Sequence, residues 1–298
     1  MKIAAHIGVK DEVELIDRTI DQLYSLGVEE ILICDLFSTD GTEKILENRR
    51  SDAFKIIKIA NDELHDVALA MDLSAVKALD ADWVVFIDAD ELLIARDGDL
   101  KGALARADAD LITVPRYNVP LGPEGALMPA DLSPEHHAQI QLIVEPPGGD
   151  MRLHLRNNPE TAWIRAVPSA KVIARQHCIG GLRDGMHQIV VAAGQTPRRR
   201  VSDELLIAHL PLTTFERFKR KVTVNIRECF DADEQLEFTD PEEEPTRAWH
   251  WRRWLALAER GELEQEFRRS QFSADELAAL QRNGTVRSAA DLFSRPRT

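Results

Sequence analysis

Three carboxylates follow a strongly apolar run, and their type and spacing suit the binding of a cation. Asp88, Asp90 and Glu91 come directly after residues 83–87, which read Trp-Val-Val-Phe-Ile. In an extended chain, side chains two residues apart share a face, so Asp88 and Asp90 can point to one side. Carboxylates this close repel each other unless a cation neutralises them, and hard oxygen ligands suit Mg²⁺ or Mn²⁺. We therefore expect Mn²⁺ or Mg²⁺ at Asp88 and Asp90; a solvated acidic turn is the alternative interpretation.

The elements before this cluster are expected to place it at the edge of a sheet. Short apolar runs alternate with longer amphipathic stretches: runs at 3–7, 30–35, 54–60 and 83–88, and stretches at 12–26, 40–48 and 63–79. This rhythm predicts an α/β fold, a mostly parallel sheet with helices on both faces. The run 83–87 does not alternate, which is typical of a central strand. Open sheets of this kind bind ligands at the carboxyl ends of their strands, where the carboxylates would lie.

The second half of the chain is less regular. A strand is predicted over 110–117, followed by proline- and glycine-rich loops at 119–137 and 146–160. Further strands are expected near 139–144, 170–175, 187–192 and 205–209. From residue 213 onward the spacing of apolar residues is helical, and an acidic linker at about 238–246 precedes a last helical segment over 246–298. We predict a catalytic domain over 1–212 and a helical C-terminal region over 213–298.

The overall charge excludes one large class of partners. The chain carries 37 basic and 51 acidic residues, a formal net charge of −14. Such a surface repels a phosphate backbone, so we expect no nucleic acid partner. An acidic protein that binds a diphosphate needs a local cation, either a basic pocket or a metal.

Other sequence features narrow the class further. The sequence contains neither GxxxxGK[ST] nor a GxGxxG after the first strand, where residues 8–12 read Gly-Val-Lys-Asp-Glu. This disfavours a P-loop ATPase and a Rossmann oxidoreductase. Three widely spaced cysteines predict neither a zinc site nor a disulfide framework. No apolar stretch reaches the roughly 20 residues that cross a bilayer, and the start resembles no signal peptide, so we expect a cytoplasmic protein.

An ordered set of short motifs resembles a known family. The set comprises residues 9–12 (VKDE), Asp35 with residues 38–42 (STDGT), residues 82–92 (DWVVFIDADEL), and residues 208–211 (AHLP) leading into 215–221. Their order and spacing over about 220 residues are similar to family 2 glycosyltransferases, in the branch with KNE, DNGSTDGT, DWVLFLDVDEF and a terminal HY. The resemblance implies a GT-A, Rossmann-like fold and a metal-dependent transfer of sugar. The donor would be a nucleotide diphosphate sugar, and the acceptor a hydroxyl of a glycan or lipid-linked glycan.

The resemblance also implies roles for single residues. It assigns contact with the nucleotide to Gly8, Lys10, Glu12, Asp35 and Asp88. Asp90 would ligate the metal with Asp88, and His209 would complete the metal shell or meet the diphosphate. Lys221 shares a helix face with Arg217 and Asn225 and is a candidate for contact with the diphosphate. The sequence departs from the family at Leu36 and Phe37, where an acidic residue or Asn, and then Gly, are usual.

A general base is sought in the glycine-containing segment 177–187. Inverting transfer requires a group that takes the proton of the acceptor hydroxyl. We nominate Asp184, with His187 as the alternative and Glu91 as a further catalytic carboxylate. A simple surface hairpin explains the same segment equally well.

The tail and two rival functions remain open at this point. The Trp- and Arg-rich segment 249–254 suits packing against the catalytic domain or a second subunit, or peripheral contact with the inner face of a membrane. An oligomer is possible. A nucleotidyltransferase, or a non-catalytic protein that binds a nucleotide or glycan on the same scaffold, is an alternative function.

Overall fold

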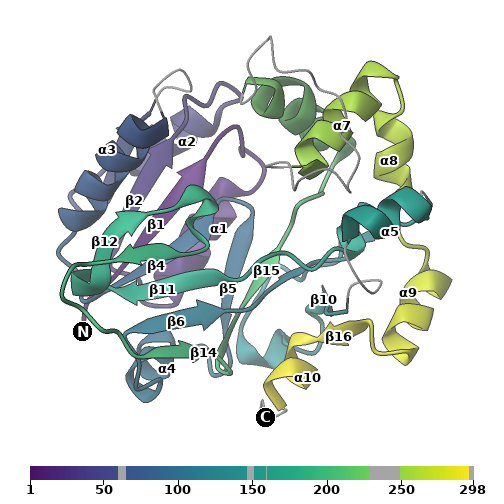
Figure 1. Cartoon of the computed structure of the whole chain (residues 1–298). Coiled ribbons are helices and arrows are strands. Elements are labelled where there is room, and N and C mark those ends of the chain that lie inside the picture. The colour runs from purple at the N-terminus through teal and green to yellow at the C-terminus, as the bar shows by residue number, and fades with distance from the viewer. Residues whose placement is uncertain (60–64, 146–150, 159, 229–248, 295–298) are drawn as a thin grey trace.

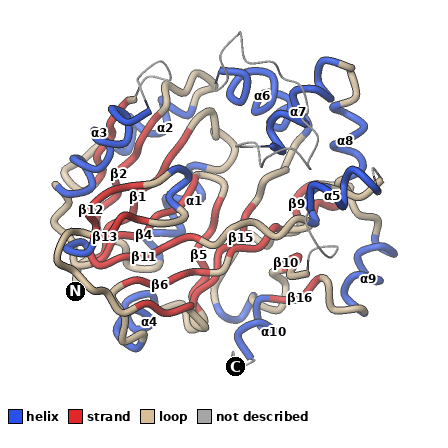
Figure 2. Tube along the Cα trace, viewed as in Figure 1, coloured by secondary structure: helices blue, strands red, loops and turns tan. Residues whose placement is uncertain are grey.

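The computed structural model describes residues 1–59, 65–145, 151–158, 160–228 and 249–294, without the side chains of 65–70, 151, 152, 156, 184 and 249. Two sheets organise this part of the chain, with helices around them (Figures 1 and 2). The linker predicted at 238–246 lies outside the described residues. Within the described part, no helix is both long enough and apolar enough to cross a bilayer.

The larger sheet has seven strands and is mostly parallel, as predicted. Its order is β14 (Arg199–Val201), β6 (Leu111–Val114), β11 (Lys171–Arg175), β4 (Trp83–Asp88), β1 (Ile3–Val9), β2 (Glu30–Asp35) and β3 (Phe54–Lys58). Every neighbouring pair is parallel except the two pairs that β11 makes, with β4 and with β6. The predicted strands at 170–175 and 83–88 are therefore adjacent, although they are far apart in sequence.

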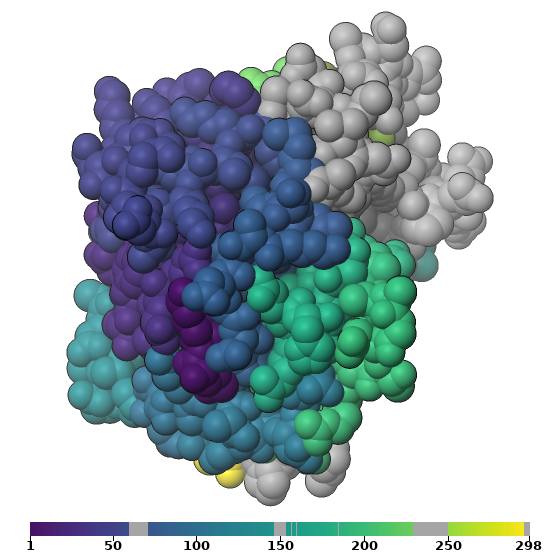
Figure 3. Space-filling model, turned by 90° about the vertical axis from the view of Figure 1, so that its left-hand side faces the viewer, coloured from purple at the N-terminus to yellow at the C-terminus, as the bar shows by residue number. Residues whose placement is uncertain are grey.

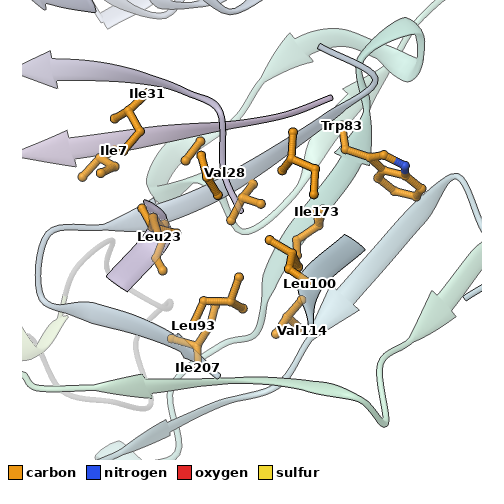
Figure 4. Packing of buried hydrophobic residues seen from close by; sticks show 14 of the residues in the cluster. Ile7, Leu23, Val28, Ile31, Trp83, Leu93, Leu100, Val114, Ile173 and Ile207 are labelled. Atoms are coloured by element: carbon orange, nitrogen blue, oxygen red, sulfur yellow. The ribbon is translucent and has the colours of Figure 1, made fainter. Parts of the chain in front are cut away.

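Helices cover both faces of this sheet, which confirms the predicted α/β class. On one face pack α1 (Ile16–Ser25), α2 (Thr42–Arg49) and α4 (Leu100–Arg106). Figure 4 shows part of the core beneath them, with Ile7 and Leu23 at one end and Leu100 beside Ile173 and Val114 at the other. On the other face lie α3 (His65–Lys77) and the hairpin of β12 (Ile179–Leu182) and β13 (Ile189–Val191). Figure 3 shows the early chain (purple to blue) beside the green segment that carries this hairpin.

The second sheet has five strands that come from distant parts of the chain. It contains β16 (Val286–Ser288), β10 (Gln141–Ile143), β7 (Arg116–Asn118), β15 (Leu205–His209) and β5 (Glu91–Ala95), in that order. The predicted strand 110–117 is in fact two strands, β6 and β7, which Pro115 divides between the two sheets. Proline lacks the N–H that a continuous ladder requires. β5 was not predicted; its first residue, Glu91, belongs to the acidic cluster itself.

The remaining elements are short. They are β8 (Leu121–Gly122), β9 (Gly125–Ala126), α5 (Met151–Asn157), α6 (Phe215–Arg220), a π-helical turn at Lys221–Ile226, α7 (Trp249–Glu259), α8 (Leu263–Arg269), α9 (Ala274–Arg282) and α10 (Ala289–Ser294). Single 3₁₀ turns lie at Pro134–His136, Trp163–Arg165, Gln176–Cys178 and Asp184–Met186.

The C-terminal region is joined to the rest by a shared core and a shared sheet. The expectation that 246–298 is wholly helical is wrong at β16, which pairs with β10. Trp254 of α7 is 3% exposed and packs edge-on against Trp163 and Phe218, with ring centroids 4.6 and 5.0 Å away. Of the possibilities for the Trp- and Arg-rich segment, packing against the preceding part of the chain is the one this contact shows.

Candidate active site

The carboxyl ends of β1, β2 and β4 meet at one edge of the larger sheet. The register pairs Gly8 with Asp88 across β1 and β4, and Val9 with Asp35 across β1 and β2. A Cβ atom at Gly8 would stand 4.0 Å from Asp88 Oδ1, so glycine keeps the space beside this carboxylate open. Three of the predicted nucleotide-binding residues therefore lie together at this edge.

Asp88 is held by a buried lysine from the antiparallel strand. Lys171 Nζ donates to Asp88 Oδ2 and to the backbone oxygen of Gly185, both at 2.7 Å, and its side chain is fully buried. Burial alone would raise the pKa of Asp88, but the charge and hydrogen bond of Lys171, together with the charge of Arg116, hold that pKa below its ordinary value. The side chain of Asp88 is still 37% exposed, so this carboxylate remains accessible.

Glu91 forms a hydrogen bond with the backbone of Asp88. Its side chain is fully buried, Oε2 accepts from the backbone N–H of Asp88 at 2.8 Å, and Oε1 accepts from Arg116. Lys171 Nζ lies 3.7 Å from Oε2. This enclosed carboxylate has no exposed surface, and the role of Glu91 as a further catalytic carboxylate stays a prediction.

Asp90 forms a second, separate cluster of charges. Its Oδ2 accepts from Lys221 Nζ at 2.8 Å and from Arg217 at 3.0 Å. Arg217 also donates hydrogen bonds to both carboxylate oxygens of Glu12, at 2.6 and 2.8 Å. Burial would raise the pKa of Asp90, but Lys221, then His209 and Arg217, hold that pKa well below its ordinary value. The predicted residues Glu12, Asp90 and Lys221 are thus brought together by α6 and the turn that follows it.

His209 reaches Asp90 because of the register of the second sheet. β15 runs antiparallel to β5 and pairs His209 with Glu91, the residue after Asp90. His209 Nε2 then lies 3.6 Å from Asp90 Oδ1, and His209 Nδ1 lies 2.7 Å from Asn118 Oδ1. The strand end predicted from the sequence therefore delivers this imidazole to the acidic cluster.

The fold family implies a divalent metal at this site. Among the described residues, no three His, Cys, Asp or Glu side chains gather as a ligand set, so Asp88, Asp90 and His209 do not form the predicted trio. Lys171 pairs with Asp88 and Lys221 pairs with Asp90 instead. Asp90 Oδ1 and His209 Nε2 do face each other, and a site for Mg²⁺ needs only one or two protein ligands besides water and substrate phosphate. The pair therefore fits such an ion.

The remaining predicted contacts with the nucleotide lie around the loop after β2. Lys10 Nζ donates to the backbone oxygen of Phe37 at 3.0 Å and lies 3.1 Å from Glu228. Asp35 is fully buried; its Oδ1 accepts from Ser38 N at 2.9 Å, while its Oδ2 has no hydrogen-bond partner within the described structure. A buried acceptor without a donor is costly, and a ligand N–H or O–H would satisfy it.

The two candidates for the general base lie on the turn after β12. The structure describes the backbone of Asp184 but not its side chain. His187 Nδ1 is 3.0 Å from the carbonyl oxygen of Ala170 and therefore donates to it, which leaves the lone pair on Nε2. Burial lowers the pKa of His187, and Lys171 and Arg116 lower it further. A neutral imidazole with a free lone pair is able to accept a proton.

Several residues of the site escaped prediction from the sequence. They are Arg116 of β7 and Lys171 of β11, and the contact that Asn118 of β7 makes with His209 was not predicted either. A charged residue within an apolar run is the available signal, as at Lys171 before Val-Ile-Ala. Such a residue is normally solvated at a strand end, and only the pairing of β11 with β4 shows that Lys171 lies beside Asp88.

A mostly parallel sheet of this order, with helices on both faces and an acidic cluster at the end of β4, has the GT-A type of architecture. Residues 5–134, which include β2 to β9 and most of β1, match the family model described as Glycosyl transferase family 2. The matched residues make up less than half of the chain. No curated protein matches the chain by sequence.

Three solved structures illustrate the similarity in shape. TarS 1-349 from S. aureus is 15% identical, with 95% of this chain and 92% of that chain covered and a TM-score of 0.42. The same protein in complex with UDP-GlcNAc gives 15% identity, coverage of 68% and 59%, and a TM-score of 0.36. The bifunctional IspDF from Campylobacter jejuni gives 9% identity, coverage of 67% and 49%, and a TM-score of 0.35.

Proposed function

We propose that this protein is a metal-dependent glycosyltransferase that moves a sugar from a nucleotide diphosphate sugar to a hydroxyl group of an acceptor, a glycan or lipid-linked glycan. The observation that carries the proposal is the facing pair of Asp90 and His209 at the carboxyl edge of the sheet, with Lys221 beside it. The match of residues 5–134 to the glycosyltransferase family supports the same reaction class.

Asp90 Oδ1 and His209 Nε2 would hold Mn²⁺ or Mg²⁺, with the exposed oxygen of Asp88 nearby for the metal or the ribose. When bound, such an ion neutralises the charge that develops on the departing diphosphate. The side chain of Lys221 is 23% exposed, so its ammonium group can also meet a phosphate oxygen while it stays paired with Asp90. These groups place positive charge where an otherwise acidic protein must bind an anion.

The nucleotide would lie over the ends of β1 and β2. Asp35 Oδ2 offers a buried acceptor for an N–H of the base or an O–H of the ribose. Gly8 leaves room beside Asp88 for the ribose, and Lys10 lies at the rim of the same loop. Glu12 acts indirectly, because both of its oxygens are engaged by Arg217.

His187 is our preferred general base, with Asp184 on the same turn as the alternative. The hydrogen bond from Nδ1 to Ala170 fixes the ring and leaves Nε2 able to take the proton of the acceptor hydroxyl. The buried Lys171 holds Gly185 of this turn and Asp88 at the same time. It thereby ties the segment that carries the base to the edge where the donor binds.

The decisive experiment measures donor turnover with and without metal. UDP- and GDP-sugars are offered with Mn²⁺ or Mg²⁺, and slow hydrolysis and transfer to glycan acceptors are followed. We expect EDTA, Asp90→Ala and His209→Gln each to reduce turnover by at least about 100-fold. Unchanged turnover in all three would refute the metal-dependent reaction.

Controls separate this result from loss of fold. Asp52→Ala, at an exposed position, is the matched carboxylate variant and should leave turnover unchanged. Circular dichroism and thermal melting verify that Asp90→Ala and His209→Gln are folded. Synthesis of a nucleotide sugar from a sugar phosphate and a nucleoside triphosphate would instead identify a nucleotidyltransferase. Binding of the nucleotide that raises the melting temperature, without any turnover, would identify a non-catalytic binding protein.

A further inference from the structure

The side-chain amide of Asn118 is enclosed and has only one possible orientation. Its Nδ2 donates to the backbone oxygens of Ile164 at 2.9 Å and Ala166 at 2.7 Å, and the residue is 1% exposed. A backbone oxygen can only accept, so the NH₂ group must face these two atoms. Oδ1 of Asn118 is therefore committed to the remaining neighbour, His209.

This orientation decides which nitrogen of His209 carries the proton. Nδ1 of His209 lies 2.7 Å from Asn118 Oδ1, which has no hydrogen to offer. Nδ1 must then be the donor, and a neutral ring protonated on Nδ1 has its lone pair on Nε2. Asn118 thus selects one of the two neutral tautomers.

The selected tautomer points a lone pair at a carboxylate. His209 Nε2 lies 3.6 Å from Asp90 Oδ1, which is beyond a good hydrogen bond. In the neutral ring, two acceptors face each other across this gap and repel; a proton on Nε2 or a divalent cation held by both atoms would remove this repulsion. Asn118 therefore leaves Nε2 as the ring nitrogen of a neutral His209 that can bind a cation shared with Asp90.

We infer that Asn118 is a positioning residue that holds His209 in the Nδ1–H tautomer and so presents Nε2 to a divalent cation shared with Asp90. The inference deepens the proposed function and rests on it for the identity of the cation. Asn118 has no contact with the reaction of its own. Its hydrogen bonds to the backbone oxygens of Ile164 and Ala166 connect the site to the turn at Trp163–Arg165. In this turn, Trp163 stacks on His250 of α7.

The test reads the tautomer directly. The protein labelled with ¹⁵N-histidine is examined at pH 8, above the ordinary pKa of histidine of about 6.5, by long-range ¹H–¹⁵N correlation. We expect a protonated Nδ1 and an unprotonated Nε2 for His209. In Asn118→Ala, the Nε2–H form should become populated. Mn²⁺ affinity, measured by electron paramagnetic resonance with the metal alone, should fall about 10- to 100-fold in this variant.

Two variants separate positioning from a merely structural role. Asn118→Asp keeps the acceptor for Nδ1–H but loses both hydrogen bonds to the backbone oxygens, so it should retain the tautomer that Asn118→Ala loses. Asn158→Ala removes an exposed asparagine side chain that bonds only the oxygen of His154 among the described contacts, and should change neither quantity.

The outcomes distinguish this inference from the proposed function. An Nε2–H tautomer in the unaltered protein, or an unchanged tautomer and Mn²⁺ affinity in Asn118→Ala, overturns the role of Asn118. The Nδ1–H tautomer in a protein that binds no Mn²⁺ supports the positioning by Asn118 and refutes the metal in the proposed function.

Discussion

Single residues at this site act mainly by fixing the protonation and direction of their neighbours. Lys171 holds Asp88, Arg217 holds Glu12 and Asp90, and a carbonyl oxygen orients His187. Charged groups buried in this way are stable only as complete sets, because removing one partner leaves an uncompensated charge. The acidic cluster predicted from the sequence is therefore part of a larger network, in which Lys171 and Arg217 pair with the carboxylates.

The protonation state of His187 gives a prediction for the pH dependence of turnover. Its folded pKa lies below the ordinary value of about 6.5, so the ring is neutral and able to act as a base above that pKa. We expect kcat/KM to be constant at neutral pH and to fall about tenfold per unit only as pH drops through a value below 6.5. His187→Gln should remove this acid limb and lower kcat. A limb that persists in the variant would exclude His187 as the base and favour Asp184.

Removal of Lys171 tests the buried network. Lys171→Met leaves Asp88 and Glu91 with Arg116 as their remaining cation, and we expect the free energy of unfolding to fall by about 3–5 kcal/mol. Urea denaturation measures this change. Lys101→Met, which breaks an exposed pair with Glu29, is the matched control and should cost less than about 1 kcal/mol. Equal effects of the two substitutions would contradict a structural role for the buried ammonium.

At the scale of elements, aromatic contacts hold α7 against the preceding part of the chain. Trp254 is the centre of these contacts, between Trp163 and Phe218. We expect Trp254→Ala to lower the free energy of unfolding by about 3–5 kcal/mol, because a large buried ring leaves a cavity. Its indole N–H has no hydrogen-bond partner in the described structure, so Trp254→Phe should cost much less. Similar losses in both variants would show that the N–H, and not the ring, is important.

The elements differ in how well the sequence predicts them. Strands β1 to β4 follow from short apolar runs between amphipathic stretches, and these runs also give the position of Asp88 at a strand end. The partners of Asp88 and His209 do not follow, since Lys171 and Asn118 lie 83 and 91 residues away from them. Their approach is decided by the pairing of β11 with β4 and of β7 with β15, and no local pattern specifies such pairing.

At the scale of the whole molecule, the two predicted regions share one hydrophobic core. The apolar cluster around Phe218 takes in Ile143 and Ile164 from the first region and Trp254, Phe267 and others from the second. β16 also forms one edge strand of the second sheet, where it pairs with β10. The boundary at 212 and 213 therefore crosses a continuous core.

A truncated chain tests this continuity. Removal of residues 246–298 should expose the cluster around Phe218 and abolish cooperative unfolding, and we expect an aggregated product in size-exclusion chromatography. The full chain is the control. A soluble, cooperatively folding fragment of residues 1–245 would show that the helices are an appendage.

The antiparallel strand β11 has a consequence for how this protein is made. β1 to β4 can pair as soon as the first 88 residues have left the ribosome, but β6 reaches the sheet only through β11, whose residues 171–175 are synthesised much later. Until then the open edge of β4 is available to any other extended chain. A nascent chain of this protein should thus depend on chaperones most strongly between about residues 90 and 175.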